Sequence, residues 1–199
     1  SYGVSGHEGP VRDLILEHMP AWAKPRVDER GNVSVTFGKP EGRPLLFIAH
    51  MDEVGFEITR IADDGSAVVR ARGGMYLSVY EAHPVVVRSA KGPVAAILAP
   101  RGGYVKSSAA QPTLESLSLY FGTTTAAETA ALGIEARQSA TVRKAFVPLG
   151  RQRATGRSMD DRNGSTALLL ALAQIDPATI TNAVTFAWSV EEETGLAGA

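Results

Sequence analysis

The chain has 199 residues, of which 44% are hydrophobic and 21% charged, and its net charge at pH 7 is −1. The hydrophobic fraction excludes a disordered chain, and 20 basic against 21 acidic residues argue against a nucleic-acid partner. The absence of cysteine excludes disulfides, thiolate metal sites and cysteine nucleophiles. The longest apolar stretch, residues 166–173, is far shorter than the roughly 18 residues of a membrane helix, and the N-terminus does not resemble a signal peptide. We therefore expect a cytoplasmic protein with no membrane partner.

The first part of the chain has the pattern of a helix followed by two strands. Ser5 and Glu8 have the spacing of a capping box before an amphipathic helix. Residues 33–37 alternate between apolar and polar side chains, as in a half-buried strand. Residues 45–49 form a continuous apolar run, which is typical of a strand covered on both faces and which ends at His50.

The middle of the chain is rich in short β-type runs separated by glycine and proline turns. The runs are residues 56–61, 67–71, 84–88 and 93–99. One helix is expected near residues 125–132, where Thr125 and Glu128 again have capping-box spacing. This texture predicts a small β-rich barrel domain, inserted over residues 56–152.

An α/β pattern returns in the last part of the chain. Residues 166–175 predict an apolar, buried helix, and residues 182–190 predict a second buried strand. We therefore expect an α/β fold in which a mixed sheet is flanked by helices. Residues 1–55 and 153–199 would form the first and second parts of this catalytic domain, interrupted by the insert.

Acidic and imidazole side chains gather where these buried elements begin or end. His50 and Asp52 follow one strand, Glu192 and Glu193 follow the other, and Asp160 lies near the start of the helix. Ligands of α/β sheets collect at the carboxyl ends of the strands. Because side chains alternate along a strand, Asp52 can reach the second imidazole nitrogen of His50 and fix its tautomer.

Each of these clusters also has a structural interpretation. A single histidine at a strand end is more often structural than a ligand. The pair Asp160-Asp161 is typical of a helix N-terminus, where a carboxylate caps the backbone. A run such as Glu191-Glu192-Glu193 is usually solvated, and Arg162 could compensate the repulsion among its carboxylates.

Taken together, the clusters follow the order of a known family. The order His50-x-Asp52, Asp160-Asp161-Arg162 and Glu192-Glu193 resembles the M42 family of metal-dependent aminopeptidases, of the glutamyl or deblocking type. Further matches are Ser5-Gly6-x-Glu8, Gly31-Asn32, residues 50–56, Gly73-Gly74 and residues 192–199. The resemblance runs along the whole chain and is weakest in the β-rich insert.

The resemblance implies a site and a reaction. Two divalent metal ions, Zn²⁺, Co²⁺ or Mn²⁺, would be bound by His50, Asp160 and Glu193, with Asp160 bridging both. Glu192 would act as the general base toward a metal-activated water, and Asp52 would orient His50. The substrates would be peptides, hydrolysed at their N-terminal residue.

The resemblance also implies ligands that this chain does not contain. The family pattern continues after the glutamate pair with a further aspartate and histidine, so each metal would keep two ligands here, whereas catalytic zinc normally has three. We therefore expect an N-terminal portion of a longer enzyme, with weak or empty metal sites and weak activity.

Two other functions are alternatives to this interpretation. One is a non-catalytic, peptidase-like fragment that acts as an association module, since the resemblance implies homo-oligomers formed partly through the insert. The other is a glycosidase, for which neighbouring glutamates at one strand end are poorly placed to flank a sugar.

Overall fold

The structure, a computed structural model, describes residues 1–100 and 113–199. These residues form two compact units, the first comprising residues 1–53 and 158–199 and the second residues 54–157. The boundaries expected from the sequence, after residues 55 and 152, differ from these by a few residues. No helix in the described ranges combines the length and the hydropathy that crossing a bilayer requires.

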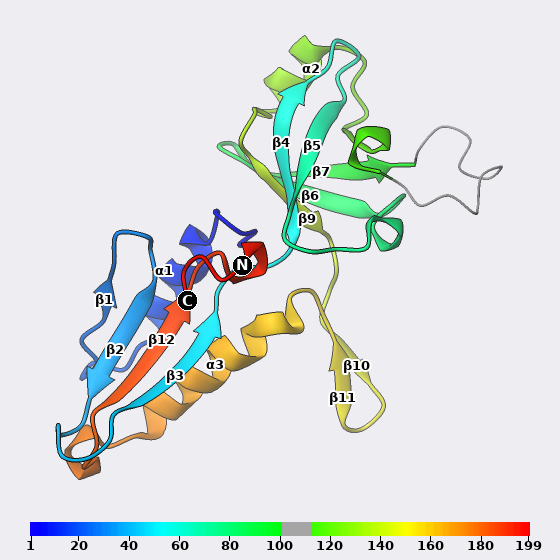
Figure 1. The fold of residues 1–199 in the computed structure, drawn as a ribbon. Helices are drawn as coiled ribbons and strands as arrows, with labels where there is room; N and C mark the ends of the chain where they lie inside the picture. The colour runs from blue at the N-terminus through cyan, green and yellow to red at the C-terminus, as the bar shows by residue number, and fades with distance from the viewer. Residues whose placement is uncertain (101–112) are drawn as a thin grey trace. The chain divides into compact units, whose positions relative to one another are not determined.

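The first unit is built on a sheet with the strand order β1-β2-β12-β3 (Figure 1). Its strands are β1 (Arg26–Val27), β2 (Val33–Phe37), β3 (Leu45–His50) and β12 (Val184–Ser189). Its helices are α1 (Gly9–Glu17), α3 (Met159–Gln174) and two 3-10 helices, Pro177–Thr179 and Glu192–Thr194. β12 runs antiparallel to β2 and parallel to β3, so the predicted mixed sheet is confirmed.

Both helices of the first unit contribute to one hydrophobic core against the sheet. The buried side chains of this core are Val11, Ile15, Val33, Val35, Phe37, Met51, Leu172, Val184, Phe186, Trp188 and Val190. The indole of Trp188 is fully buried, and its Nε1 donates a hydrogen bond to the carbonyl of Ser165 in α3. This bond joins the first half of α3 to the strand that ends at the candidate site.

The burial expected for β3 is wrong. Leu45, Leu46, Phe47 and Ile48 are 45%, 64%, 48% and 50% exposed. Within the described chain β3 pairs with β12 along one edge, and no strand pairs with its other edge. A continuous apolar run indicates that a strand can be covered on both faces, but the described residues leave the side chains of Leu45 to Ile48 about half exposed.

The helices differ from the sequence predictions at three points. The capping box at Ser5 and Glu8 is wrong, because the Ser5 hydroxyl donates to Asp52 and Glu8 is itself the N-cap residue, without a side-chain cap. α3 begins at Met159 rather than near residue 166. The complete burial expected for α3 is also wrong, since Leu170 is 58% exposed.

The second unit is a closed barrel with the strand order β4-β5-β8-β7-β6-β9, which confirms the predicted β-rich barrel (Figure 1). Its strands are β4 (Gly55–Ile61), β5 (Ala67–Arg72), β6 (Pro84–Ser89), β7 (Gly92–Ala99), β8 (Ser118–Tyr120) and β9 (Ser139–Val142). Other elements are α2 (Ala126–Ala131), the 3-10 helices Leu77–Val79 and Leu114–Ser116, and the hairpin of β10 (Val147–Leu149) with β11 (Arg153–Thr155). The predicted cap of α2 is confirmed, because Thr125 Oγ1 accepts a hydrogen bond from the N–H of Glu128.

Candidate metal centre

His50 is the last residue of β3 and is held by the beginning of α3. Its backbone N–H donates to Asp161 Oδ2 at 3.3 Å, and its carbonyl accepts a hydrogen bond from Ser165 Oγ at 3.0 Å. Asp161 also accepts the N–H of Gly164 through its other oxygen. The strand end and the first turns of the helix are therefore joined on both sides of the histidine.

The imidazole of His50 is surrounded by carboxylates. Its Nε2 lies 3.1 Å from Asp160 Oδ1 and 3.7 Å from Glu192 Oε2. Its Nδ1 lies 3.3 Å from Asp52 Oδ1, in an orientation that falls short of a good hydrogen bond. The carboxylate of Asp52, supported by that of Asp160, raises the pKa of His50 to about 9 although burial alone would lower it.

Asp52 is fully buried next to Nδ1 of the His50 imidazole. Its two oxygens accept hydrogen bonds from the N–H groups of Glu192 and Glu193, each at 3.0 Å. Burial alone would raise the pKa of Asp52, but the contact with His50 and the hydrogen bonds from Ser5 and these two N–H groups lower it overall. One ionised carboxylate thus contacts the imidazole and fixes the backbone that carries both glutamates.

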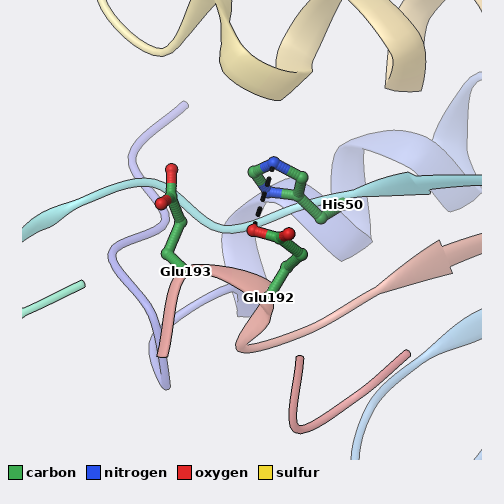
Figure 2. A group of neighbouring side chains, drawn as sticks. All are labelled: His50, Glu192 and Glu193. Carbon is green, nitrogen blue, oxygen red and sulfur yellow. Dashed lines mark ion pairs between the residues drawn. The ribbon is translucent and has the colours of Figure 1, made fainter. Parts of the chain in front are cut away.

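Glu192 and Glu193 project from the 3-10 helix that follows β12, toward the side on which the His50 imidazole lies (Figure 2). One ligand atom from each of these three residues lies within 4.8 Å of the others. Burial raises the pKa of Glu193; the charge of His50 opposes this rise, whereas the carboxylate of Asp160 adds to it. The cluster therefore concentrates negative charge that a cation would neutralise.

Asp160 reaches the site from the first turn of α3, and its side chain is 87% exposed. The backbone of Asp160 and Asp161 departs from helical geometry, so both residues lie at a kink in α3. Arg162 donates to the carbonyl of Met51, and its Nη2 lies 3.5 Å from Glu53 Oε1.

The donor set suits a divalent metal ion. An imidazole nitrogen and carboxylate oxygens are the ligands that Zn²⁺, Co²⁺ and Mn²⁺ accept in proteins. A buried carboxylate against the second imidazole nitrogen is the usual support of a metal-bound histidine, and Asp52 lies there. His50 and Asp160 could be joined by the ion on one side, and Glu193 is within reach on the other.

Three residues support the site through contacts that the sequence did not predict. Glu53 is buried, accepts hydrogen bonds from the Gly3 N–H and the Ser158 hydroxyl, and faces Arg162. Glu8 and Asn32 accept hydrogen bonds from the backbone next to the glutamate pair. All three residues belong to segments that match the family, and this match was the available signal. Their hydrogen-bond partners, however, lie far away in sequence.

Comparison with known proteins supports a peptidase relationship. A profile of the family described as M42 glutamyl aminopeptidase matches residues 31–199. SgcX of Escherichia coli (strain K12) is 28% identical over 98% of this chain and 54% of its own length. The chain therefore spans about half the length of this curated relative.

Solved structures of aminopeptidases have the same fold. The aminopeptidase APDkam598 of Desulfurococcus kamchatkensis is 30% identical with a TM-score of 0.90, covering 100% of this chain and 55% of its own. The TET1 peptidase of Pyrococcus horikoshii has the same identity and TM-score, covering 100% of this chain and 60% of its own. Together with the extent of the profile match, these similarities show that the chain belongs to the M42 glutamyl aminopeptidase family.

Proposed function

We propose that the protein is a metal-dependent aminopeptidase that removes N-terminal residues from peptides. The observation that carries the proposal is the convergence of His50, Glu192 and Glu193, whose ligand atoms lie within 4.8 Å of one another in a chain of the M42 family. These residues come from two strand ends that neighbour each other in the sheet. The residues that match the family therefore form a candidate set of metal ligands.

The proposed roles follow from the position of each side chain. His50, Asp160 and Glu193 would hold the divalent ions, which when bound polarise the scissile carbonyl and acidify water. Glu192 would take a proton from the attacking water and deliver it to the leaving amine. Asp52 would hold the imidazole and the glutamate backbone in place.

The proposed ions also fit a substrate with a free amino terminus. Held by His50, Asp160 and Glu193, they could orient the α-amine of a peptide, because a bound ion can serve as a template for the substrate. The identity of the preferred N-terminal side chain would be set by other surfaces of the protein.

We also propose that the protein forms homo-oligomers. The Pyrococcus horikoshii TET1 peptidase is described as assembling into a tetrahedron or a large octahedral shell. In the present chain the barrel unit, residues 54–157, is the candidate for a subunit contact. Size-exclusion chromatography with light scattering on the chain and on a variant altered in the barrel surface would test this.

Hydrolysis of leucine and glutamate p-nitroanilides in the presence of Zn²⁺, Co²⁺ or Mn²⁺ tests the proposed activity. A general base contributes about 10²–10⁴ to rate, so we expect Glu192→Gln to lose at least about a hundredfold in kcat while it still binds the ion. Glu193→Gln should instead weaken ion binding. Unchanged hydrolysis by Glu192→Gln would refute the proposed mechanism.

A chain that binds the ion and self-associates but hydrolyses neither anilide would support the non-catalytic alternative. The observation that favours this alternative is the small ligand set, because His50 and Asp160 on one side and Glu193 on the other give fewer donors than catalytic zinc usually has.

A further inference from the structure

The segment that carries the glutamate pair is held by side chains at four successive backbone positions. The N–H of Val190 donates to Asn32 Oδ1 at 2.9 Å, and the N–H of Glu191 donates to Glu8 Oε1 at 3.0 Å. The next two N–H groups, of Glu192 and Glu193, donate to Asp52. Three side chains from three separate parts of the first unit therefore fix this turn.

Glu8 is well placed to act as a fixed acceptor. It is 6% exposed, and the oxygen that accepts from Glu191 also accepts the N–H of Gly6 at 2.8 Å. Its own carbonyl accepts from the N–H groups of Val11 and Arg12, so its backbone is part of the first turn of α1. These bonds fix the backbone from which the carboxylate extends, and the N–H of Gly6 holds the carboxylate itself.

The residue that Glu8 holds has an unusual backbone. Glu191 has φ of 50° and ψ of 34°, in the left-handed region, which is sterically unfavourable for a non-glycine residue. This conformation turns the chain out of β12 and into the 3-10 helix of Glu192–Thr194. A specific acceptor for the Glu191 N–H stabilises the turn that aims the two following carboxylates at His50.

Asn32 has a fixed orientation as well. Its Nδ2 donates to Asp28 Oδ2 at 2.8 Å, which leaves Oδ1 to face the N–H of Val190. The other Asp28 oxygen accepts the N–H groups of Arg30, Gly31 and Asn32, so the loop before β2 is closed around one carboxylate. Asn32 thus connects this loop to the end of β12.

We infer that Glu8 and Asn32 are positioning residues of the metal centre, which orient Glu192 and Glu193 by fixing the N–H groups of Glu191 and Val190. The inference rests on the proposed function in one respect, the role of the two glutamates toward a cation. Neither Glu8 nor Asn32 is among the three residues whose ligand atoms converge, so both act through the backbone.

Titration of the chain with CoCl₂, by calorimetry and by the visible absorption of the bound ion, tests the inference. Loss of a supporting contact typically costs about 10–100-fold in metal affinity, so we expect Glu8→Ala and Asn32→Ala each to weaken Co²⁺ binding at least about tenfold. Glu8→Gln keeps the accepting oxygen and should bind Co²⁺ nearly as tightly as the unaltered chain.

Glu81→Ala provides the matched control, because Glu81 is a glutamate of the barrel unit that is 4% exposed. Its removal should leave Co²⁺ affinity unchanged at a temperature where all variants are folded. Equal affinity of Glu8→Ala and the unaltered chain would overturn the inference. So would an equal loss in Glu8→Ala and Glu81→Ala, because that would indicate a general loss of stability.

Backbone hydrogen exchange without metal gives a second readout. Glu8→Ala should speed exchange about tenfold at Glu192 and Glu193 as well as at Glu191, because the whole turn loosens, and Glu8→Gln should not. Faster exchange confined to Glu191 would overturn the inference. If the unaltered chain binds no Co²⁺, the proposed function fails, and the exchange result alone then decides whether Glu8 positions the glutamates.

Discussion

The imidazole Nε2 of His50 lies 3.1 Å from Oδ1 of Asp160, although 110 residues separate them in the chain. The contact exists because the end of β3 and the beginning of α3 are joined by the bonds of Asp161 and Ser165 to the backbone of His50. The barrel unit is inserted between these two elements in sequence, and its two junctions follow Glu53 and precede Ser158. Both chain segments that flank the insert therefore lead directly to the site.

Asp52 is expected to be the residue of the site whose loss most weakens the fold. It is fully buried and accepts three hydrogen bonds besides its contact with His50, from Ser5 and from the N–H groups of Glu192 and Glu193. Asp52→Ala leaves these donors without their acceptor, so we expect the free energy of unfolding to fall by roughly 2–4 kcal/mol in urea titration. Asp52→Asn, which keeps one acceptor oxygen, should lose less. Identical urea midpoints for the alanine variant and the unaltered chain would contradict the proposed support.

The stability of the metal-free protein should depend on pH through His50. Its pKa is raised from 6.5 to about 9 by Asp52 and Asp160, so the folded state binds the proton more tightly than the unfolded state. The resulting stabilisation is complete below pH 6.5 and is lost as the pH rises to about 9, by roughly 1–3 kcal/mol. Urea titrations in EDTA across this range would measure the decrease. His50→Gln should flatten it, and equal slopes in both proteins would disprove the assignment to His50.

The exposed strand β3 should make the isolated chain prone to association. Leu46 is 64% exposed on a strand whose second edge has no partner among the described residues, and an open apolar edge is a template for strand pairing. We expect Leu46→Lys to lower the mass-average size seen by sedimentation at high protein concentration. Leu14→Lys, which removes an exposed leucine from α1, is the control and should change the size less. Equal effects of the two substitutions would show that the strand edge is not responsible.

Trp188 should be important for the stability of the first unit. Its indole is fully buried and donates to the Ser165 carbonyl at 3.1 Å, which ties β12 to α3. Trp188→Phe removes this donor and leaves a small void, so we expect a loss of about 1–3 kcal/mol in the free energy of unfolding. Urea titrations followed by far-UV circular dichroism measure this loss, because the substitution itself changes the tryptophan fluorescence. A loss no larger than that of an exposed substitution such as Leu170→Ala would contradict this role.

Local sequence patterns predicted most of the helices and strands, because these elements depend mainly on neighbouring residues. The alternation in β2 and the apolar run that became β12 both reflect the face each strand presents to the core. The barrel strands β8 and β9 were not expected, since each is short and its pairing with distant strands is not visible in a local pattern. Long-range pairing, rather than propensity, determines where these strands begin and end.

The capping box at Ser5 shows why the supports of the site could not be predicted. Its spacing is that of a local helix cap, yet Ser5 bonds Asp52 and Glu8 bonds the N–H of Glu191, which are distant in sequence. The sequence identified the charged residues that converge, but the groups that hold them depend on the tertiary fold. The burial expected for β3 was wrong for a related reason, because hydrophobicity indicates what a strand can bury and not what covers it.

The most direct test of the metal centre is the binding of Co²⁺ to the chain and to His50→Ala, measured by calorimetry under identical conditions. If the imidazole of His50 is a ligand of the ion, as proposed together with Asp160 and Glu193, the unaltered chain binds Co²⁺ and the variant binds it at least about tenfold more weakly. Equal affinities would contradict a metal centre at His50. So would the absence of Co²⁺ binding by the folded, unaltered chain.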